Sequence, residues 1–187
     1  MKKERLYHSL RLMMCKTPAK RAAYLKKHDI LGSIGDNCKW GPWLVPLYPE
    51  LIRLGNNVHV HKTAKIVTHD MLNRYLKTRN PDDDFGHGEK LGCVDMQDNV
   101  YMSMNVTVMP DVRIGKDTIV TAGSVVTSDI PENSVASGIP AKVTGRFDMF
   151  LALRKMSRGQ CVKVKNQEMD PAVAAEVWER FNKRRDK

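Results

Sequence analysis

The sequence predicts a mainly β fold in which short parallel strands wind into a three-sided coil. Three observations predict it: a period of six residues, apolar side chains at one position of each hexad, and small or β-branched side chains at another. An amphipathic helix would need an apolar residue every 3.6 positions, and a single strand would need strict alternation. Neither template has a period of six, whereas a coil with one short strand and one corner per hexad does.

Six consecutive hexads run from residue 96 to residue 131. If three hexads close one turn of 18 residues, equivalent residues stack about 4.8 Å apart, the distance between hydrogen-bonded strands. We expect the first position to point inward and the fifth to lie near a corner, with Asn99, Asn105, Gly115 and Gly123 supplying unusual backbone angles. The first positions are Met96, Met102, Val108, Ile114, Val120 and Val126. The fifth positions are Val100, Val106, Val112, Thr118, Ser124 and Ile130.

The same pattern occurs upstream with two interruptions. Hexads cover 54–66 and 34–39, and a Pro-rich segment separates the two. Residues 71–91 follow no hexad, are polar and contain Pro81 and two glycines, so we expect a loop extruded from a corner. Its role is open between a functional loop and a tolerated insertion.

Helical patterns occupy both ends of the chain. Thr17 followed by Pro18, and Asp170 followed by Pro171, are N-cap and first-turn signals, and residues 148–157 have the pattern of a short helix. We therefore predict three segments: an N-terminal helical segment at 1–30, the coil at 31–147 with its loop at 71–91, and a C-terminal helical segment at 148–187.

The composition excludes several classes of protein. The net charge of +10 divides into +7 for residues 1–30, −2 for 31–145 and +5 for 146–187, and no nucleic-acid-binding motif accompanies the basic ends. No apolar run is long enough to span a bilayer, and the basic first residues lack the apolar stretch of a secretory signal. Four cysteines without CxxC spacing fit a reducing compartment, so we expect a cytoplasmic protein that binds no nucleic acid.

The hexads, the stretch VTAGSVVTSDIPENSVASGIPAKV at 120–143 and THD at 68–70 resemble the hexapeptide-repeat acyltransferases. Similarity is greatest to the branch of capsular-polysaccharide and sugar O-acetyltransferases, with the maltose and galactoside acetyltransferases. The resemblance implies a left-handed parallel β-helix and a homotrimer with active sites between subunits. It also implies acetyl-CoA as co-substrate, with no metal.

The resemblance places the catalytic base of the family at His69. A histidine suits this chemistry because its pKa near neutrality lets it remove the proton of an attacking hydroxyl. Three further residues are candidates for binding the acceptor: Asp70, His87 and Tyr101. His59 and His61 alternate on the outer face and are expected to be solvated, although one of them could line the acceptor groove.

The same resemblance identifies residues for acetyl-CoA. Small residues at Ala122 and Gly123 would let the pantetheine run along the coil, although a corner needs small residues in any case. Thr127 and Ser128 occupy the next corner, where the family commonly has Thr-Lys, so Ser128 departs from the family and lacks the charge of that lysine for a phosphate contact. A basic residue following Pro-Ala is expected to meet the nucleotide phosphates. The expected cofactor-binding residues are Met104, Ala122, Gly123, Thr127, Ser128, Lys142 and Arg146.

The predicted function is acetyl-CoA-dependent O-acetylation of a sugar or polysaccharide precursor by direct attack, because no serine or cysteine has the sequence context of an activated nucleophile. N-acetylation of an amino-sugar nucleotide and acetylation of an antibiotic remain alternatives, since a base serves either nucleophile. A carbonic-anhydrase-like metalloenzyme is disfavoured because His59, His61 and His69 lack the required spacing. A scaffold that lost catalysis stays open, and the sequence does not identify the acceptor.

Overall fold

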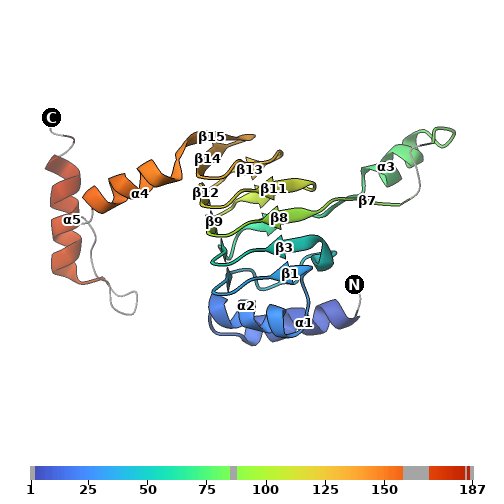
Figure 1. Ribbon diagram of the computed structural model, residues 1–187, viewed down its shortest axis with the longest axis horizontal. Helices are drawn as coiled ribbons and strands as arrows, with labels where there is room; N and C mark the ends of the chain where they lie inside the picture. The colour runs from blue at the N-terminus through green and yellow to red at the C-terminus, as the bar shows by residue number, and fades with distance from the viewer. Residues whose placement is uncertain (1–2, 85–87, 158–168, 184, 186–187) are drawn as a thin grey trace. The chain divides into compact units, whose positions relative to one another are not determined.

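Short parallel strands wind into a three-sided coil in the computed structural model, which describes residues 3–84, 88–157, 169–183 and 185 (Figure 1). We name its three walls sheets A, B and C. Sheet A contains β1 (Ser33–Ile34), β3 (Ile52–Leu54), β8 (Val94–Met96) and β11 (Val112–Ile114). Sheet B contains β2 (Lys39–Trp40), β4 (His59–Val60), β9 (Val100–Met102), β12 (Thr118–Val120), β14 (Ser134–Gly138) and the antiparallel β15 (Ala141–Arg146). Sheet C contains β5 (Lys65–Ile66), β10 (Thr107–Val108) and β13 (Val125–Val126).

The strand register confirms the predicted turn of three hexads. Tyr101 pairs with Ile119, and Thr107 pairs with Val125, so the partners lie 18 residues apart. His59 pairs with Tyr101 across 42 residues, because one turn there carries an insertion of 24 residues. The chain therefore passes from sheet A to B to C and back, which produces three corners that we call A/B, B/C and C/A.

The interior of the coil is filled by the first and fifth positions of the hexads. All six first positions have no exposed side-chain surface, and the six fifth positions are at most 4% exposed. Each turn covers the core of the next, so stability depends on contacts between neighbouring turns. The predicted inward direction of the first position is confirmed.

The A/B corners contain a stacked column of residues in the left-handed backbone conformation. Asn37, Asn57, Asn99 and Asp117 have φ between 53° and 61°. Each of the three asparagine amides donates to the next side chain in the column, at 2.7, 2.9 and 2.8 Å. Asn and Asp tolerate this conformation better than other residues with a Cβ, so both backbone and side chain favour them here.

The positive φ predicted for Asn99, Asn105 and Gly123 is confirmed, and the prediction for Gly115 is wrong. Gly115 is needed for a different reason. A Cβ at that position would lie 2.5 Å from the backbone nitrogen of Glu132 in the next turn. The residue is small because two turns approach closely, not because its backbone is unusual.

Two helices, α1 (Lys3–Met14) and α2 (Pro18–Lys27), cover the end of the coil at β1 and β2 (Figure 1). Their apolar side chains Leu12 and Leu25 are fully buried in the same core. The predicted cap is present, since Thr17 Oγ1 accepts a hydrogen bond from Lys20 N at 3.2 Å. The N-terminal helices therefore close one end of the coil.

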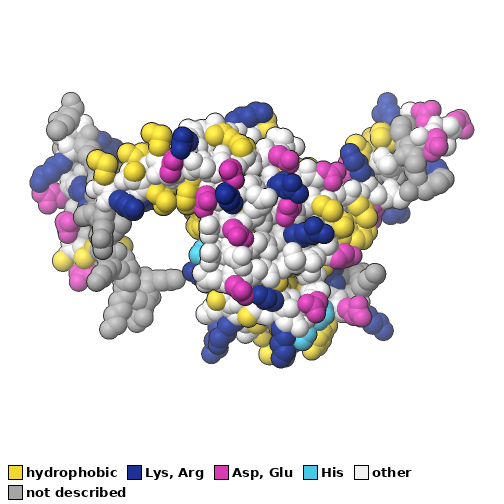
Figure 2. Space-filling view, in the orientation of Figure 1, with side chains coloured by type: hydrophobic (Ala, Val, Ile, Leu, Met, Phe, Trp, Pro, Cys, Tyr) yellow, Lys and Arg dark blue, Asp and Glu magenta, His cyan; other side chains and the backbone are white. Residues whose placement is uncertain are grey.

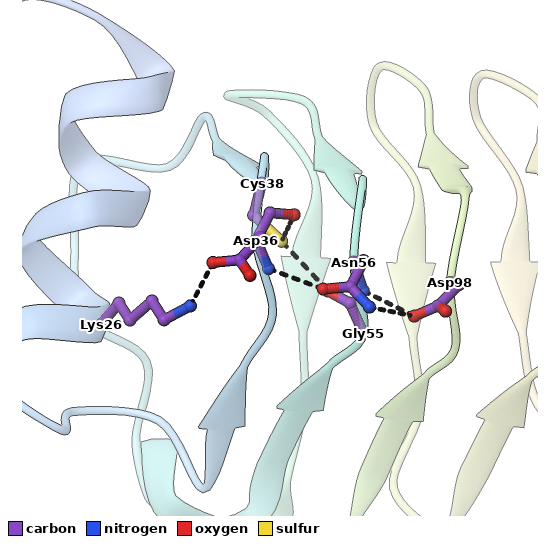
Figure 3. Close-up of polar contacts among 6 residues, drawn as sticks. All are labelled: Lys26, Asp36, Cys38, Gly55, Asn56 and Asp98. Atoms are coloured by element: carbon purple, nitrogen blue, oxygen red, sulfur yellow. Dashed lines mark hydrogen bonds and ion pairs between the residues drawn. The ribbon is translucent and has the colours of Figure 1, made fainter.

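A row of polar contacts at the A/B corner joins α2 to the first turns (Figure 3). Lys26 forms an ion pair with Asp36, whose backbone nitrogen donates to Asn56 Oδ1 at 2.8 Å. Asn56 N in turn donates to Asp98 Oδ1 at 2.6 Å, and Cys38 Sγ donates to the carbonyl oxygen of Gly55 at 3.1 Å. Three successive turns are thus linked to the helical cap along one edge.

The outer surface of sheet A and the adjoining A/B corner carry charges of both signs. Figure 2 shows Lys and Arg side chains interspersed with Asp and Glu over the coil. Arg113 Nε lies 2.8 Å from Asp95 Oδ2, and Lys116 Nζ lies 3.5 Å from Glu132 Oε2. Such compensated, exposed pairs contribute little to stability and are typical of a solvated face.

The hexad pattern is interrupted twice, and each interruption has its own structure. In the first turn, residues 41–51 replace the strand of sheet C and end in a short 3₁₀ helix, η1 (Pro49–Leu51). In the second turn the chain leaves the coil as an arm, residues 69–91, built of β6 (His69–Asp70), α3 (Leu72–Arg79) and β7 (Lys90–Leu91). β6 and β7 pair antiparallel. The extruded loop is confirmed, but sequence analysis missed its helix and ladder.

Two further helices follow the coil, α4 (Phe147–Met156) and α5 (Pro171–Lys183), and neither contains a buried residue. The protein divides into two compact units, one up to Phe150 and one from Leu151 onward. Within the described residues, each helix is too short or too polar to cross a bilayer.

Candidate functional site

The predicted base, His69, lies at the C/A corner of the second turn, where the chain leaves sheet C and enters the arm. Its neighbour Thr68 is buried, and two hydrogen bonds hold the backbone at this corner. Thr68 Oγ1 donates to the carbonyl oxygen of Leu47 at 2.7 Å, and the carbonyl oxygen of Thr68 accepts from Gly92 N at 2.9 Å. The first-turn loop and the returning end of the arm therefore meet beside His69.

The imidazole of His69 is half-buried, and its two nitrogens differ in environment. Nδ1 is buried and has no hydrogen-bond partner among the described residues. Because Nδ1 is enclosed by the protein, a ligand would have to bind His69 through Nε2. The ring of Tyr48 packs edge-on against the imidazole, with 5.6 Å between centroids and 72° between planes.

Tyr48 is held in place from both ends. Its backbone has a φ of 47°, which is uncommon for a residue with a bulky side chain, and its hydroxyl donates to Glu89 Oε2 at 2.9 Å. The bond to Glu89 is the main cause that raises the pKa of Tyr48. Tyr48 thus connects the first-turn loop to the residue that precedes β7, directly beside His69.

Asp70 is turned toward the arm. Its Oδ1 accepts a hydrogen bond from Leu72 N at the start of α3. The side chain is exposed, and this bond ties it to the backbone of the arm. His87 lies outside the described residues.

Three of the predicted cofactor residues come together at the B/C corner. Gly123 N donates to the carbonyl oxygen of Met104 at 2.9 Å, so the corners of two turns stack, and Ala122 is the exposed neighbour. Gly123 has a φ of 75°, and no atom lies within 4 Å of the position of a Cβ. This corner is therefore an open edge with exposed backbone.

Lys142 lies close to the same corner. It pairs with Ser137 in the antiparallel β14–β15 ladder, and the adjacent Gly138 donates from its backbone nitrogen to Ser124 Oγ at 3.2 Å. Ser124 directly follows Gly123. The ammonium group of Lys142 is exposed, and no described residue forms an ion pair with it.

The remaining predicted cofactor residues lie elsewhere. Thr127 and Ser128 follow β13 and belong to the C/A corner. Arg146 pairs with Ser134 at the far end of β15, and its guanidinium is bound by Asp148 through Nε at 3.1 Å and through Nη2. The side chain of Asp148 raises the pKa of Arg146. Within one chain, Arg146 is therefore separated from Lys142 and already has a partner.

His69 and the B/C corner lie at opposite ends of the strands of sheet C. Met104 precedes β10, whereas His69 follows β5, the strand beside β10. Val67 N donates to the carbonyl oxygen of Val108, which aligns the two strands. One chain by itself does not bring the predicted base next to the predicted cofactor residues.

Tyr101 points outward from β9, and its nearest aromatic neighbour is His59 on β4, with 6.1 Å between ring centroids. His59 is half-buried. Burial is the main cause that lowers its pKa, and the charge of Lys39 adds to the effect. The expectation that His59 is solvated is therefore wrong in part. His61 is also half-buried.

Within the described residues, no three His, Cys, Asp or Glu side chains are grouped as metal ligands.

Similar sequences support the same assignment of fold. No protein-family model matches the sequence. A Schizosaccharomyces pombe protein named "Putative acetyltransferase" is 39% identical over 94 residues, which cover 49% of this chain and 42% of that protein. A galactoside O-acetyltransferase of Lactococcus lactis is 50% identical over 53 residues, which cover 28% and 26%. The matched region thus spans less than half the length of either relative.

Among solved structures, a hexapeptide-repeat-containing acetyltransferase of Vibrio cholerae has a TM-score of 0.56 at 17% identity, and the match covers 77% of this chain and 89% of that one. A Vibrio cholerae structure with acetyl-CoA has a TM-score of 0.51 at 18% identity, covering 77% and 85%. At this identity the likeness concerns the fold. The predicted coil of hexapeptide repeats is confirmed, and so is the resemblance to the hexapeptide-repeat acetyltransferases.

Proposed function

We propose that the protein is an acetyl-CoA-dependent O-acetyltransferase that uses His69 as general base on a hydroxyl of a sugar or polysaccharide precursor. The observation that carries the proposal is the placement of His69. It is a half-buried imidazole at the corner where the arm begins, packed against the ring of Tyr48, and its buried Nδ1 leaves Nε2 for a ligand. Sequence relatives named as acetyltransferases support the class of reaction.

The chemistry follows from this geometry. A sugar hydroxyl is a weak nucleophile until its proton is removed, and general-base assistance contributes about 10²–10⁴ in rate. Nε2 of His69 accepts the proton while the hydroxyl oxygen bonds to the acetyl carbonyl carbon. The carbon–sulfur bond then breaks, and the imidazolium returns the proton to the departing sulfur. Tyr48 limits rotation of the imidazole during both transfers.

The B/C corner is a suitable place for the co-substrate. Acetyl-CoA supplies an acetyl group that is activated as a thioester. The open space at Gly123 and the exposed Met104 would let its pantetheine approach the backbone closely. Lys142 would meet a phosphate, because an ammonium group forms strong, charge-assisted hydrogen bonds with phosphate oxygens.

A homotrimer would complete the site. In one chain, His69 and the B/C corner lie at opposite ends of the strands of sheet C, so neither site is whole. A cyclic arrangement of three copies can bring the C/A corner of one copy to the B/C corner of the next, and it creates three equivalent sites. A cytoplasmic location remains a prediction from the sequence.

The proposal is tested by release of free CoA from acetyl-CoA over a panel of sugars, nucleotide sugars, amino sugars and antibiotics. O-acetylation of a saccharide, identified by mass spectrometry and by its lability to mild base, is the expected result. Acetylation of amines alone would favour the N-acetyltransferase alternative. Absence of CoA binding in calorimetry would overturn the proposal altogether.

A further inference from the structure

A cavity of about 250 Å³ lies between the start of α2 and the outer face of sheet B. We call it the basic pocket. It is bordered by Pro18 at the N-terminus of α2, by Lys39 and His59 on sheet B, and by Tyr101 on the next strand. Arg21, His61 and Lys62 also line it.

The charges around the basic pocket are all positive. No aspartate or glutamate is among the residues that line it, and no described residue forms an ion pair with Lys39 or Lys62. Arg21 is buried, and it donates through Nε to Trp40 O at 3.0 Å and through Nη1 to Cys15 O at 2.8 Å. Carbonyl oxygens hold its guanidinium without neutralising the charge. The N-terminus of α2 adds the positive end of a helix dipole.

The two histidines complete this environment. His61 Nδ1 lies 3.0 Å from Thr63 Oγ1 and 3.3 Å from Thr63 N, so Nε2 is the nitrogen left for a ligand. His59 is half-buried, and burial together with Lys39 lowers its pKa. Positively charged groups thus lie close together in the basic pocket, and each disfavours the charged form of its neighbours. A bound anion would stabilise this arrangement.

The position of the basic pocket relates it to the acetyl donor. Tyr101 borders the pocket, and β9 continues from it into the corner that holds Met104. An exposed aromatic ring beside cationic groups suits a ligand with a ring face and a negative charge. Acidic saccharides combine these two features with several hydroxyl groups.

We propose that the basic pocket binds the anionic group, a carboxylate or a phosphate, of a saccharide acceptor whose ring packs on Tyr101. This inference rests on the proposed acetyltransferase function, and it narrows the acceptor from sugars in general to negatively charged ones. Lys39 and Lys62 supply the charge, His61 donates from Nε2, and His59 becomes protonated when the anion is bound.

The test uses the full-length protein and four probes: glucuronate, glucose 6-phosphate, inorganic phosphate and glucose. Titration calorimetry measures affinity, and NMR of the imidazole nitrogens follows His59. We expect one or both acidic sugars to bind more tightly than phosphate, no measurable binding of glucose, and a higher pKa of His59 in the complex. The two acidic sugars decide between carboxylate and phosphate.

The pH dependence of binding provides a second readout. Glucuronate stays ionised above pH 5, so its own charge does not change over the range of interest. Its affinity should increase as the pH falls through the pKa of His59, because the anion favours the imidazolium. The groups that face His59 are Lys39, His61, Lys62, Arg21 and the phenol of Tyr101. Because a second imidazole, His61, also lines the pocket, the His59→Asn variant is needed to assign the dependence to His59.

The double variant Lys39→Met with Lys62→Met should weaken binding of the acidic sugar at least about tenfold. The matched control is Lys27→Met, at the opposite end of α2, which should bind normally. Equal binding by the double variant, an unchanged pKa of His59, or binding of inorganic phosphate alone would each overturn the inference. Because the readout is binding, it is independent of acetyl transfer. Failure to bind acetyl-CoA would remove the proposed function instead.

Discussion

The regular turns of the coil and its two interruptions differ in what they contribute. From residue 94 to residue 130 the hexads run unbroken, every inward side chain is buried, and the outer faces are short strands. Residues 41–51 and 69–91 break the period, and they position Tyr48, His69 and Glu89. The periodic part builds a rigid wall, whereas the interruptions place side chains that the period does not require.

The regular part should be the more sensitive to loss of volume. Met102 is fully buried in β9, and Met102→Ala should lower the free energy of unfolding by about 2–5 kcal/mol through lost burial and a cavity. The matched change is Met104→Ala, two residues later at an exposed corner, which should cost less than about 0.5 kcal/mol. Urea denaturation measures both. Similar losses for the two variants would mean that the stacked interior does not dominate stability.

In the second interruption, residues 69–91, a substitution of His69 should affect activity far more than stability. His69→Ala should reduce turnover at least about a hundredfold, because the variant loses the general base that takes the proton of the acceptor hydroxyl. Circular dichroism and oligomeric state should be unchanged, since the imidazole forms no hydrogen bond within the described residues. The control is His28→Ala, an exposed imidazole at the end of α2. Near-normal turnover of the His69 variant would exclude this residue as the base.

The sequence was sufficient for the periodic part and insufficient for the interruptions. The hexads determine which side chains point inward and where corners fall, so the core and the stacked corner of Met104 and Gly123 could be predicted. Tyr48 and Glu89 could not, because they meet across 41 residues through two segments that follow no period.

Arg146 illustrates a second limit of prediction from the sequence. It was expected to join Lys142, but β15 is extended, and four residues of extended strand separate the two by about 13 Å.

The contacts of Tyr48 with Glu89 and His69, which join the two interruptions, can be weakened by two substitutions. Tyr48→Phe keeps the ring against His69 and loses the hydroxyl bond to Glu89, so we expect about a threefold fall in kcat. Tyr48→Leu also loses the ring contact and should cost about tenfold. Because Tyr48 positions the base and does not bind the co-substrate, the KM for acetyl-CoA should stay constant.

A double-mutant cycle sharpens this comparison. Glu89→Gln combined with Tyr48→Phe should cost no more than the larger single change, since both remove the same bond. Equal loss of kcat in the Phe and Leu variants, accompanied by a lower melting temperature, would indicate a purely structural role for Tyr48.

The smallest effect should come from Lys142, at the end of the regular part. Lys142→Ala should raise the KM for acetyl-CoA about threefold and leave the KM for the acceptor unchanged, because a single exposed ammonium group contributes little to phosphate binding when solvent screens it. Lys116→Ala, at the A/B corner and paired with Glu132, removes the same charge and should leave both constants unchanged. A shift in the acceptor KM of the Lys142 variant would instead place the acceptor, and not the nucleotide, beside β15.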